Sequence, residues 1–101
     1  MRTPSDVIAT RELAAHAADG TRHVVRLRLF ASQAWERDWR CRYEIDGGGM
    51  SSSAAGHGVD SLQALMNAQI MMSAFVISEA RAHRLRLTWL GSNALGLPNP
   101  E

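Results

Sequence analysis

The side chains that most often carry out chemistry are present in this chain, but they are scattered. The four histidines stand singly, with no pair at helical or zinc-finger spacing: His16, His23, His57 and His83. The single cysteine, Cys41, alternates with charged residues in a predicted strand, which favours a small core residue over a nucleophile. We therefore expect no metal site and no cofactor, and we predict that the protein is not an enzyme.

Two short motifs also fall short of a catalytic or phosphate-binding pattern. Ser51–Ser53 lacks the glycine spacing of a nucleophile elbow. Gly56-His57-Gly58 precedes a predicted helix and could cradle an anion there, but the acidic Asp60 at the helix start opposes that by charge. We expect these glycines to form a joint that lets the chain turn into the helix.

Arginine accounts for all eleven basic residues, and the net charge is only +1. The balance of charge therefore points to no polyanionic partner. The absence of lysine is typical of a GC-rich genome. The alternative is selection of planar guanidinium groups for binding carboxylates or phosphates.

Five segments have the pattern of strands: Val7–His16, Thr21–Ala31, Asp38–Asp46, Met50–Ala55 and Leu85–Leu90. The third is the clearest, because apolar and charged residues alternate along it with a period of two. The apolar face of this third segment comprises Trp39, Cys41, Tyr43 and Ile45. The fourth segment is weakly specified by its serines.

A helix is predicted over residues 60–83, with Asp60 as N-cap and Gln63 completing a capping box. At about 100° per residue, one side of this helix should pack on the sheet. That side comprises Leu62, Leu65, Ala68, Met72, Phe75, Val76 and Ala80.

Together these elements predict an α+β fold, in which one long helix packs on one face of an antiparallel sheet of four to five strands, in the order β-β-β-β-α-β. The 101 residues should form a single domain, with an ordered core at about residues 7–98. One cysteine, no signal-peptide pattern and no apolar run long enough to span a bilayer favour a cytoplasmic protein, with no membrane association.

Two surfaces remain for binding. Met66, Ile70 and Ile77 lie on a flank of the helix that the sheet need not cover. Either the C-terminal tail buries this flank through Leu95 and Leu97, or the flank contacts a partner or a second copy in a homodimer.

The other surface is the open face of the sheet, where we expect Arg26, Arg28, Phe30, Arg40, Arg42 and Arg86. Cross-strand pairs with acidic residues would make it an ordinary solvated face. It could instead bind an acidic protein surface. Nucleic acid is a less favoured partner, because Phe30 is the one aromatic residue expected there for base stacking.

Three motifs resemble those of a family of small, uncharacterised bacterial proteins, some reminiscent of polymorphic-toxin immunity proteins. The first is the W-x-C-x-x-x-I-x-G strand over residues 39–47, and the second is the G-x-D-S-L-Q-A-L helix start over residues 58–65. The third is Trp89-x-Gly91 followed by Leu95-Gly96-Leu97-Pro98. The resemblance covers about residues 11–98 and implies a bacterial cytoplasmic α+β domain, with no catalytic residue to transfer.

The leading hypothesis is a non-enzymatic protein-interaction domain, such as an immunity or inhibitor protein that binds a toxin or another enzyme. Its expected partner-binding residues are Arg26, Arg28, Phe30, Trp35, Arg40, Arg42, Met66, Ile70 and Ile77. A small nucleic-acid-binding module that uses the arginine face is the second hypothesis. The third is a small-molecule pocket between helix and sheet, around Gln69, Tyr43 and Cys41.

Overall fold

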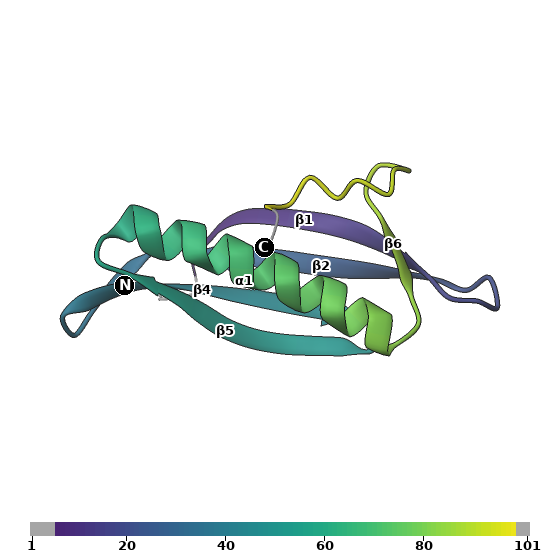
Figure 1. The fold of residues 1–101 in the computed structure, drawn as a ribbon, viewed down its shortest axis with the longest axis horizontal. Helices are drawn as coiled ribbons and strands as arrows, with labels where there is room; N and C mark the ends of the chain where they lie inside the picture. Colours follow the sequence, from purple (N-terminus) through teal and green to yellow (C-terminus); the bar gives the residue numbers. More distant parts are fainter. Residues whose placement is uncertain (1–5, 99–101) are drawn as a thin grey trace.

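A computed structural model describes residues 6–98 and confirms the α+β fold, with one helix packed on an antiparallel sheet (Figure 1). The strands are β1 (Val7–His16), β2 (Arg22–Phe30), β3 (Gln33–Trp35), β4 (Asp38–Gly47), β5 (Met50–Gly58) and β6 (Arg86–Thr88), and the helix α1 (Ser61–Ala82) lies between β5 and β6. Residues 1–5 and 99–101, which the prediction places outside the ordered core together with Asp6, lie outside the described residues.

Strand β4 is the centre of the sheet. It pairs with β2 and β3 along one side and with β5 along the other, with Leu27 opposite Ile45 and Cys41 opposite Gly56. Strand β1 pairs with β2 and, at its end, with β6, where Ala14 lies opposite Thr88. The described sheet therefore has β5 at one edge and β6 at the other.

Strand β3 is a correction to the prediction, whose five strands leave residues 32–37 as a connection between the second and the third. Within that segment Gln33, Ala34 and Trp35 form a short strand that pairs antiparallel with the start of β4. The three residues have no apolar alternation, so their pairing comes from the tight turn to β4 rather than from a buried face.

Glycines in β5 bring α1 unusually close to the sheet. A Cβ on Gly56 would lie 2.3 Å from the Ala68 backbone nitrogen, and one on Gly58 would lie 2.5 Å from that of Ala64. The expected joint at Gly56–Gly58 is therefore wrong: these residues are the last part of β5. Their missing side chains serve the packing of α1 rather than a hinge.

The start of α1 is capped as its sequence suggests, with one difference. The Gln63 backbone N–H donates to Asp60 Oδ1 at 2.8 Å, which is the predicted N-cap bond. The Gln63 side-chain oxygen accepts from the Val59 N–H at 2.7 Å, one residue before the cap itself. The cap still satisfies two backbone donors at the helix start.

The buried side of α1 follows a row of every fourth residue, which confirms the predicted face at Ala68, Met72, Val76 and Ala80 but not at Leu62. This row turns by about 40° around the helix at each step, so different sides are buried at the two ends. Leu62, expected on the sheet, is exposed, whereas Ser73 is buried. The buried helix residues are Ala64, Ala68, Met72, Ser73, Val76 and Ala80.

The core lies between α1 and the sheet and confirms the inward face predicted for β4. Cys41, Tyr43 and Ile45 are buried, and Trp39 packs against them at the margin. By length and composition alone α1 would be able to cross a membrane, a test that core helices of soluble proteins also pass. In this fold one side of α1 packs on β4 and β5.

Candidate functional site

Two arginines on the open sheet face are stacked on aromatic rings. The Arg40 guanidinium lies 3.8 Å from the centroid of the Trp35 ring, and that of Arg42 lies 4.5 Å from the centroid of the Phe30 ring. Both contacts place the positive charge over the electron-rich face of a ring. Arg40 Nε is buried and has no hydrogen-bond partner.

Phe30 is on the predicted face but is not exposed. Only 3 % of its surface is accessible, so the expectation of a solvent-facing aromatic residue is wrong. Trp35 does remain exposed, at 42 %. A partner approaching this face would meet Trp35 and the guanidinium of Arg42, which covers the Phe30 ring.

Arg26 and Arg28 of this face are matched by acidic residues on neighbouring strands, and Arg42 is matched by an acidic residue of its own strand, β4. Arg28 Nη1 lies 2.8 Å from Asp46 Oδ2 and 3.6 Å from Glu44 Oε1. Arg42 Nη2 lies 3.4 Å from Glu44 Oε2, and Arg26 Nη2 lies 3.1 Å from Glu12 Oε2. The predicted cross-strand pairs are thus present, and they neutralise much of the positive charge.

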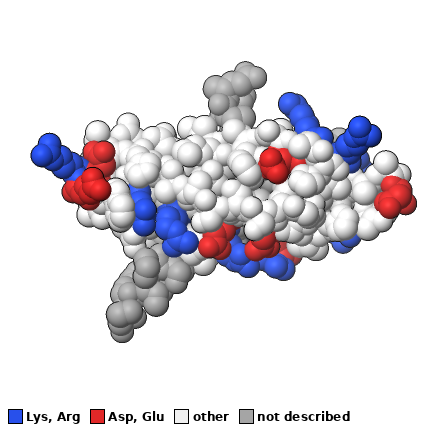
Figure 2. Space-filling model, turned by 90° about the horizontal axis from the view of Figure 1, so that it is seen from below, with Lys and Arg blue, Asp and Glu red and all other residues white. Residues whose placement is uncertain are grey.

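The charged side chains seen from below the molecule agree with this pairing. Figure 2 shows blue and red atoms close together along the lower edge of the molecule and at its two ends, with a broad area of uncharged residues between these groups. Arg86, also expected on the open face, is exposed and lines a shallow hollow there with Glu12, His16 and Arg22.

The flank of α1 divides into a covered and an uncovered part. Ile77 is half-buried and lines a pocket with Leu95 and Leu97 of the tail, as one of the two sequence interpretations expected. Met66 and Ile70 remain 53 % and 37 % exposed. The tail therefore covers the second half of this flank and leaves the first half open.

Two further apolar residues extend the open half, and the sequence interpretation missed both. Leu62 is 61 % exposed and Val59 is 76 % exposed. Leu62, Met66 and Ile70 follow one another at every fourth position, so they form a row along one side of the helix. This spacing is visible in the sequence and could have identified Leu62 as part of the exposed side. We name Leu62, Met66 and Ile70 the apolar row; Val59 lies just before the helix.

The tail is held in place by Arg11 from β1. Arg11 Nη1 donates to the carbonyl oxygens of Leu95 at 3.0 Å and Gly96 at 2.9 Å, and its guanidinium lies 3.8 Å from the centroid of the Trp89 ring. A Cβ on Gly96 would lie 2.5 Å from that ring.

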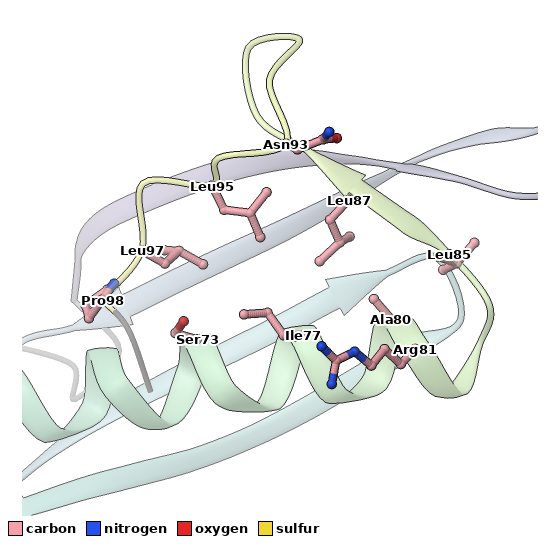
Figure 3. Close-up of a pocket in the computed structure, with 10 residues that line it drawn as sticks. All are labelled: Ser73, Ile77, Ala80, Arg81, Leu85, Leu87, Asn93, Leu95, Leu97 and Pro98. Atoms are coloured by element: carbon pink, nitrogen blue, oxygen red, sulfur yellow. The ribbon is translucent and has the colours of Figure 1, made fainter. Parts of the chain in front are cut away.

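A pocket of about 470 Å³ lies between the second half of α1, β6 and the tail. Figure 3 shows Leu87 and Leu95 pointing toward α1, and Ile77 pointing back toward them. The other lining residues are Ser73, Ala80, Arg81, Leu85, Asn93, Leu97 and Pro98. It is formed by apolar side chains with a few polar groups, which is the usual composition of small-molecule sites.

This pocket is not at the position that the sequence suggested. Cys41 and Tyr43 are buried in the core and line none of the described pockets, whereas Gln69 lines a smaller cavity of about 120 Å³ beside β1. Cys41 Sγ donates to the Phe30 carbonyl oxygen at 3.1 Å. Burial raises the pKa of the Cys41 thiol above its ordinary value, which disfavours the nucleophilic thiolate.

The histidines stay apart in the fold. His16 Nε2 lies 3.0 Å from the Thr88 hydroxyl at the β1–β6 pair, and His57 is exposed on β5. Within residues 6–98, no three His, Cys, Asp or Glu side chains are grouped so that they could hold a metal ion.

Comparison with known proteins identifies a family but no activity. No curated protein matches the chain, and no solved structure matches it. One family model, described as a domain of unknown function, covers residues 9–99, close to the extent expected from the motifs. Since the model spans nearly the whole sequence, the chain belongs to the uncharacterised DUF6968 family.

Proposed function

We propose that this domain is a non-catalytic module that binds another protein through the apolar row of α1. The observation that carries the proposal is the exposure of Leu62 and Met66, 61 % and 53 %, on successive turns of a helix whose other side forms the core. Single exposed apolar residues are normal on protein surfaces, but a contiguous row is typical of an interface.

The size of the row fits the anchors of a protein interface. Burying a Leu, Ile or Met side chain completely is worth roughly 1.5–3 kcal/mol relative to leaving it exposed. A few such anchors usually supply most of the binding free energy. Their spacing along a helix suits a partner that offers an apolar groove or a second amphipathic helix.

The arginine face is the less favoured binding surface. Arg26, Arg28 and Arg42 already lie near acidic side chains of the same sheet, so a partner would have to compete with those contacts. The pair of Arg40 and Trp35 is the exception and is a candidate secondary contact, because Arg and Trp are enriched among interface anchors.

The pairing of Arg26, Arg28 and Arg42 with acidic side chains argues against the nucleic-acid hypothesis. Phosphate recognition needs arginines that are free to displace the counterions of the nucleic acid, and such binding weakens steeply with salt. A gel shift of single- or double-stranded RNA or DNA at low salt, lost on adding salt and on the change Arg28→Gln, would favour that hypothesis over ours.

Among protein-binding roles, we favour that of a bacterial cytoplasmic immunity or inhibitor protein that sequesters a toxin or another enzyme. The small size of the domain and the sequence resemblance to immunity-like proteins support this form. Genomic neighbourhood offers a direct check, because immunity genes lie beside the genes of their toxins. The absence of any toxin-like neighbour would count against this form while leaving partner binding open.

The test is co-purification with a tagged copy at native expression, comparing Met66→Glu with Ser78→Glu. Ser78 is exposed on α1 outside the apolar row, so both variants add one carboxylate to the same helix. We expect Met66→Glu to lose a stoichiometric partner that the wild type and Ser78→Glu retain. Retention by Met66→Glu together with loss by Arg40→Ala would move the binding surface to the open sheet face.

A second copy of this chain is another candidate occupant of the apolar row. Light scattering at high micromolar concentration separates this case from a different partner. A dimer that Met66→Glu dissociates and Ser78→Glu does not would identify the row as a homodimer interface, whereas a monomer would exclude it.

A further inference from the structure

A buried hydroxyl without a partner points into the pocket beneath the tail. The Ser73 side chain is 1 % exposed, and its Oγ has no hydrogen-bond partner. A serine in a helix often bonds to the carbonyl four residues earlier, but Ser73 makes no such bond. Figure 3 shows its oxygen directed from α1 toward the tail.

Leaving such a group unsatisfied is costly, and most buried hydroxyls in folded proteins have a partner. The exceptions often mark a place where a ligand supplies the missing bond. Here Ser73 lines a pocket of about 470 Å³, which is within the range of small-molecule sites, and its buried Oγ lies just behind the pocket wall.

The rest of the lining indicates which kind of ligand fits. Ile77, Leu87 and Leu95 provide an apolar interior, which suits a hydrocarbon or aromatic body. Arg81 lines the same pocket, and within the described residues no acidic side chain forms an ion pair with it. Asn93 adds an amide on the tail side. The lining thus combines apolar walls with the guanidinium of Arg81, which has no described ion pair, and the Ser73 hydroxyl, which has no hydrogen-bond partner.

We propose that this pocket binds a small monocarboxylic acid with an apolar body. The body lies against the leucines and Ile77, the carboxylate accepts from Ser73, and the exposed Arg81 supplies the countercharge. This site is separate from the apolar row, which lies on the first half of α1, so the two proposals stand independently.

The test uses octanoate as the probe, with n-octanol as the uncharged analogue, followed by isothermal titration and by amide shifts in NMR spectra. We expect octanoate to bind in the millimolar range or tighter, with shifts at residues 73–81 and 93–97. Octanol should bind more weakly, because it cannot pair with Arg81. Phosphatidylcholine vesicles are the third arm, and binding to them but not to free octanoate would overturn the proposal in favour of a lipid surface.

Three variants distinguish this site from nonspecific association. Ser73→Ala should weaken octanoate binding about 3- to 10-fold, which is the value of one lost hydrogen bond. Arg81→Gln should lower the affinity for octanoate to that for octanol. Ser78→Ala, which removes an exposed hydroxyl from the same helix, should change neither.

Either of two results would overturn the proposal. The first is the absence of heat and of shifts with both probes into the millimolar range. The second is octanoate binding that Ser73→Ala and Arg81→Gln leave unchanged, which would place the ligand elsewhere. Both variants change side chains that no described hydrogen bond or ion pair requires, so their folding is not at issue.

Discussion

The guanidinium of Arg11 lies 3.8 Å from the centroid of the Trp89 ring. The same group donates to two carbonyl oxygens of the tail. One side chain from the first strand thus joins the turn after the last strand to the tail that forms a wall of the pocket. Cation–π stacking and two charge-assisted hydrogen bonds act together at this point.

Replacing Arg11 with alanine should loosen the tail and lower the free energy of unfolding by about 1–2 kcal/mol. Hydrogen exchange at residues 94–97 should speed up more than exchange in β4. Urea denaturation measures the stability change. Arg22→Ala, an exposed arginine at the start of β2, is the control and should stay within about 0.5 kcal/mol of wild type. Equal losses in the two variants would refute the role of Arg11.

Alanine at Gly56 should destabilise the fold by about 3 kcal/mol, because its Cβ would meet backbone rather than a movable side chain. The control is Gly20→Ala. Gly20 has a positive φ of 90° but nothing within 4 Å, so only backbone strain of about 1 kcal/mol is expected there. Denaturant midpoints of the two variants that coincide would show that the close packing of α1 on β5 contributes little.

Alanine at Ser73 should stabilise the ligand-free protein by about 1 kcal/mol, because it removes a buried hydroxyl that has no partner. Ser78→Ala, on the exposed side, measures the part of this gain that comes from helix propensity alone, no more than about 0.5 kcal/mol. Thermal unfolding of the two variants gives the comparison. A loss of stability in Ser73→Ala would mean that the hydroxyl does form a bond in solution.

Glycine at Arg84 should stabilise the protein by about 0.5–1 kcal/mol. Arg84 has a φ of 58°, and it occupies the position after the helix cap where glycine is the common residue. The bonds around it, Leu85 N–H to Ala80 O and Arg84 N–H to Arg81 O, complete a Schellman motif. Arg86→Gly, in the neighbouring strand, should destabilise instead. A lower melting temperature for Arg84→Gly would contradict this interpretation.

Stability should decline in alkali because of two buried groups. Burial raises the pKa of the Cys41 thiol and of the Tyr43 phenol above their ordinary values. A raised folded pKa gives a contribution that is fully present below the unfolded pKa and is lost as pH rises through the folded one. The loss should therefore begin at about pH 8.5 for Cys41 and about pH 10 for Tyr43.

The composition makes this window unusually simple to interpret. The chain has one Cys, one Tyr and no lysine, so few other groups titrate there. The free energy of unfolding, measured by urea at successive pH values, should fall less steeply in Cys41→Ala above about pH 8.5. An unchanged slope in that variant would show that Cys41 is not the source.

The elements of the fold were predictable from the sequence where a local residue pattern is sufficient to specify them. The alternation in β4 identified a half-buried strand, and Asp60 with Gln63 identified the start of α1, because both signals are local. The helix face was harder. Leu62 was expected in the core, but the helix packs closely on Gly56 and Gly58, and these glycines are read as turn residues when the sequence is considered alone.

The candidate sites were predictable only in part. Met66 and Ile70 were identified as surplus apolar residues from the helix alone. Ser73 gave no signal, since a serine among apolar helix residues is ordinary until its surroundings are known. The pocket depends on the contact between Arg11 and the tail, which are far apart in sequence. No local sequence pattern predicts a contact of that kind.

The close contact of α1 with β5 also bears on how the chain assembles. Strands β4 and β5 and the helix follow one another directly in the sequence, and each packs against the next, so this unit forms over short chain separations. Contacts of that kind form fast, whereas pairing β1 with β6 must close almost the whole chain into a loop. The β4–β5–α1 unit and the β1–β2 hairpin are therefore the parts whose contacts form over the shortest chain separations, and the β1–β6 pair closes the longest loop.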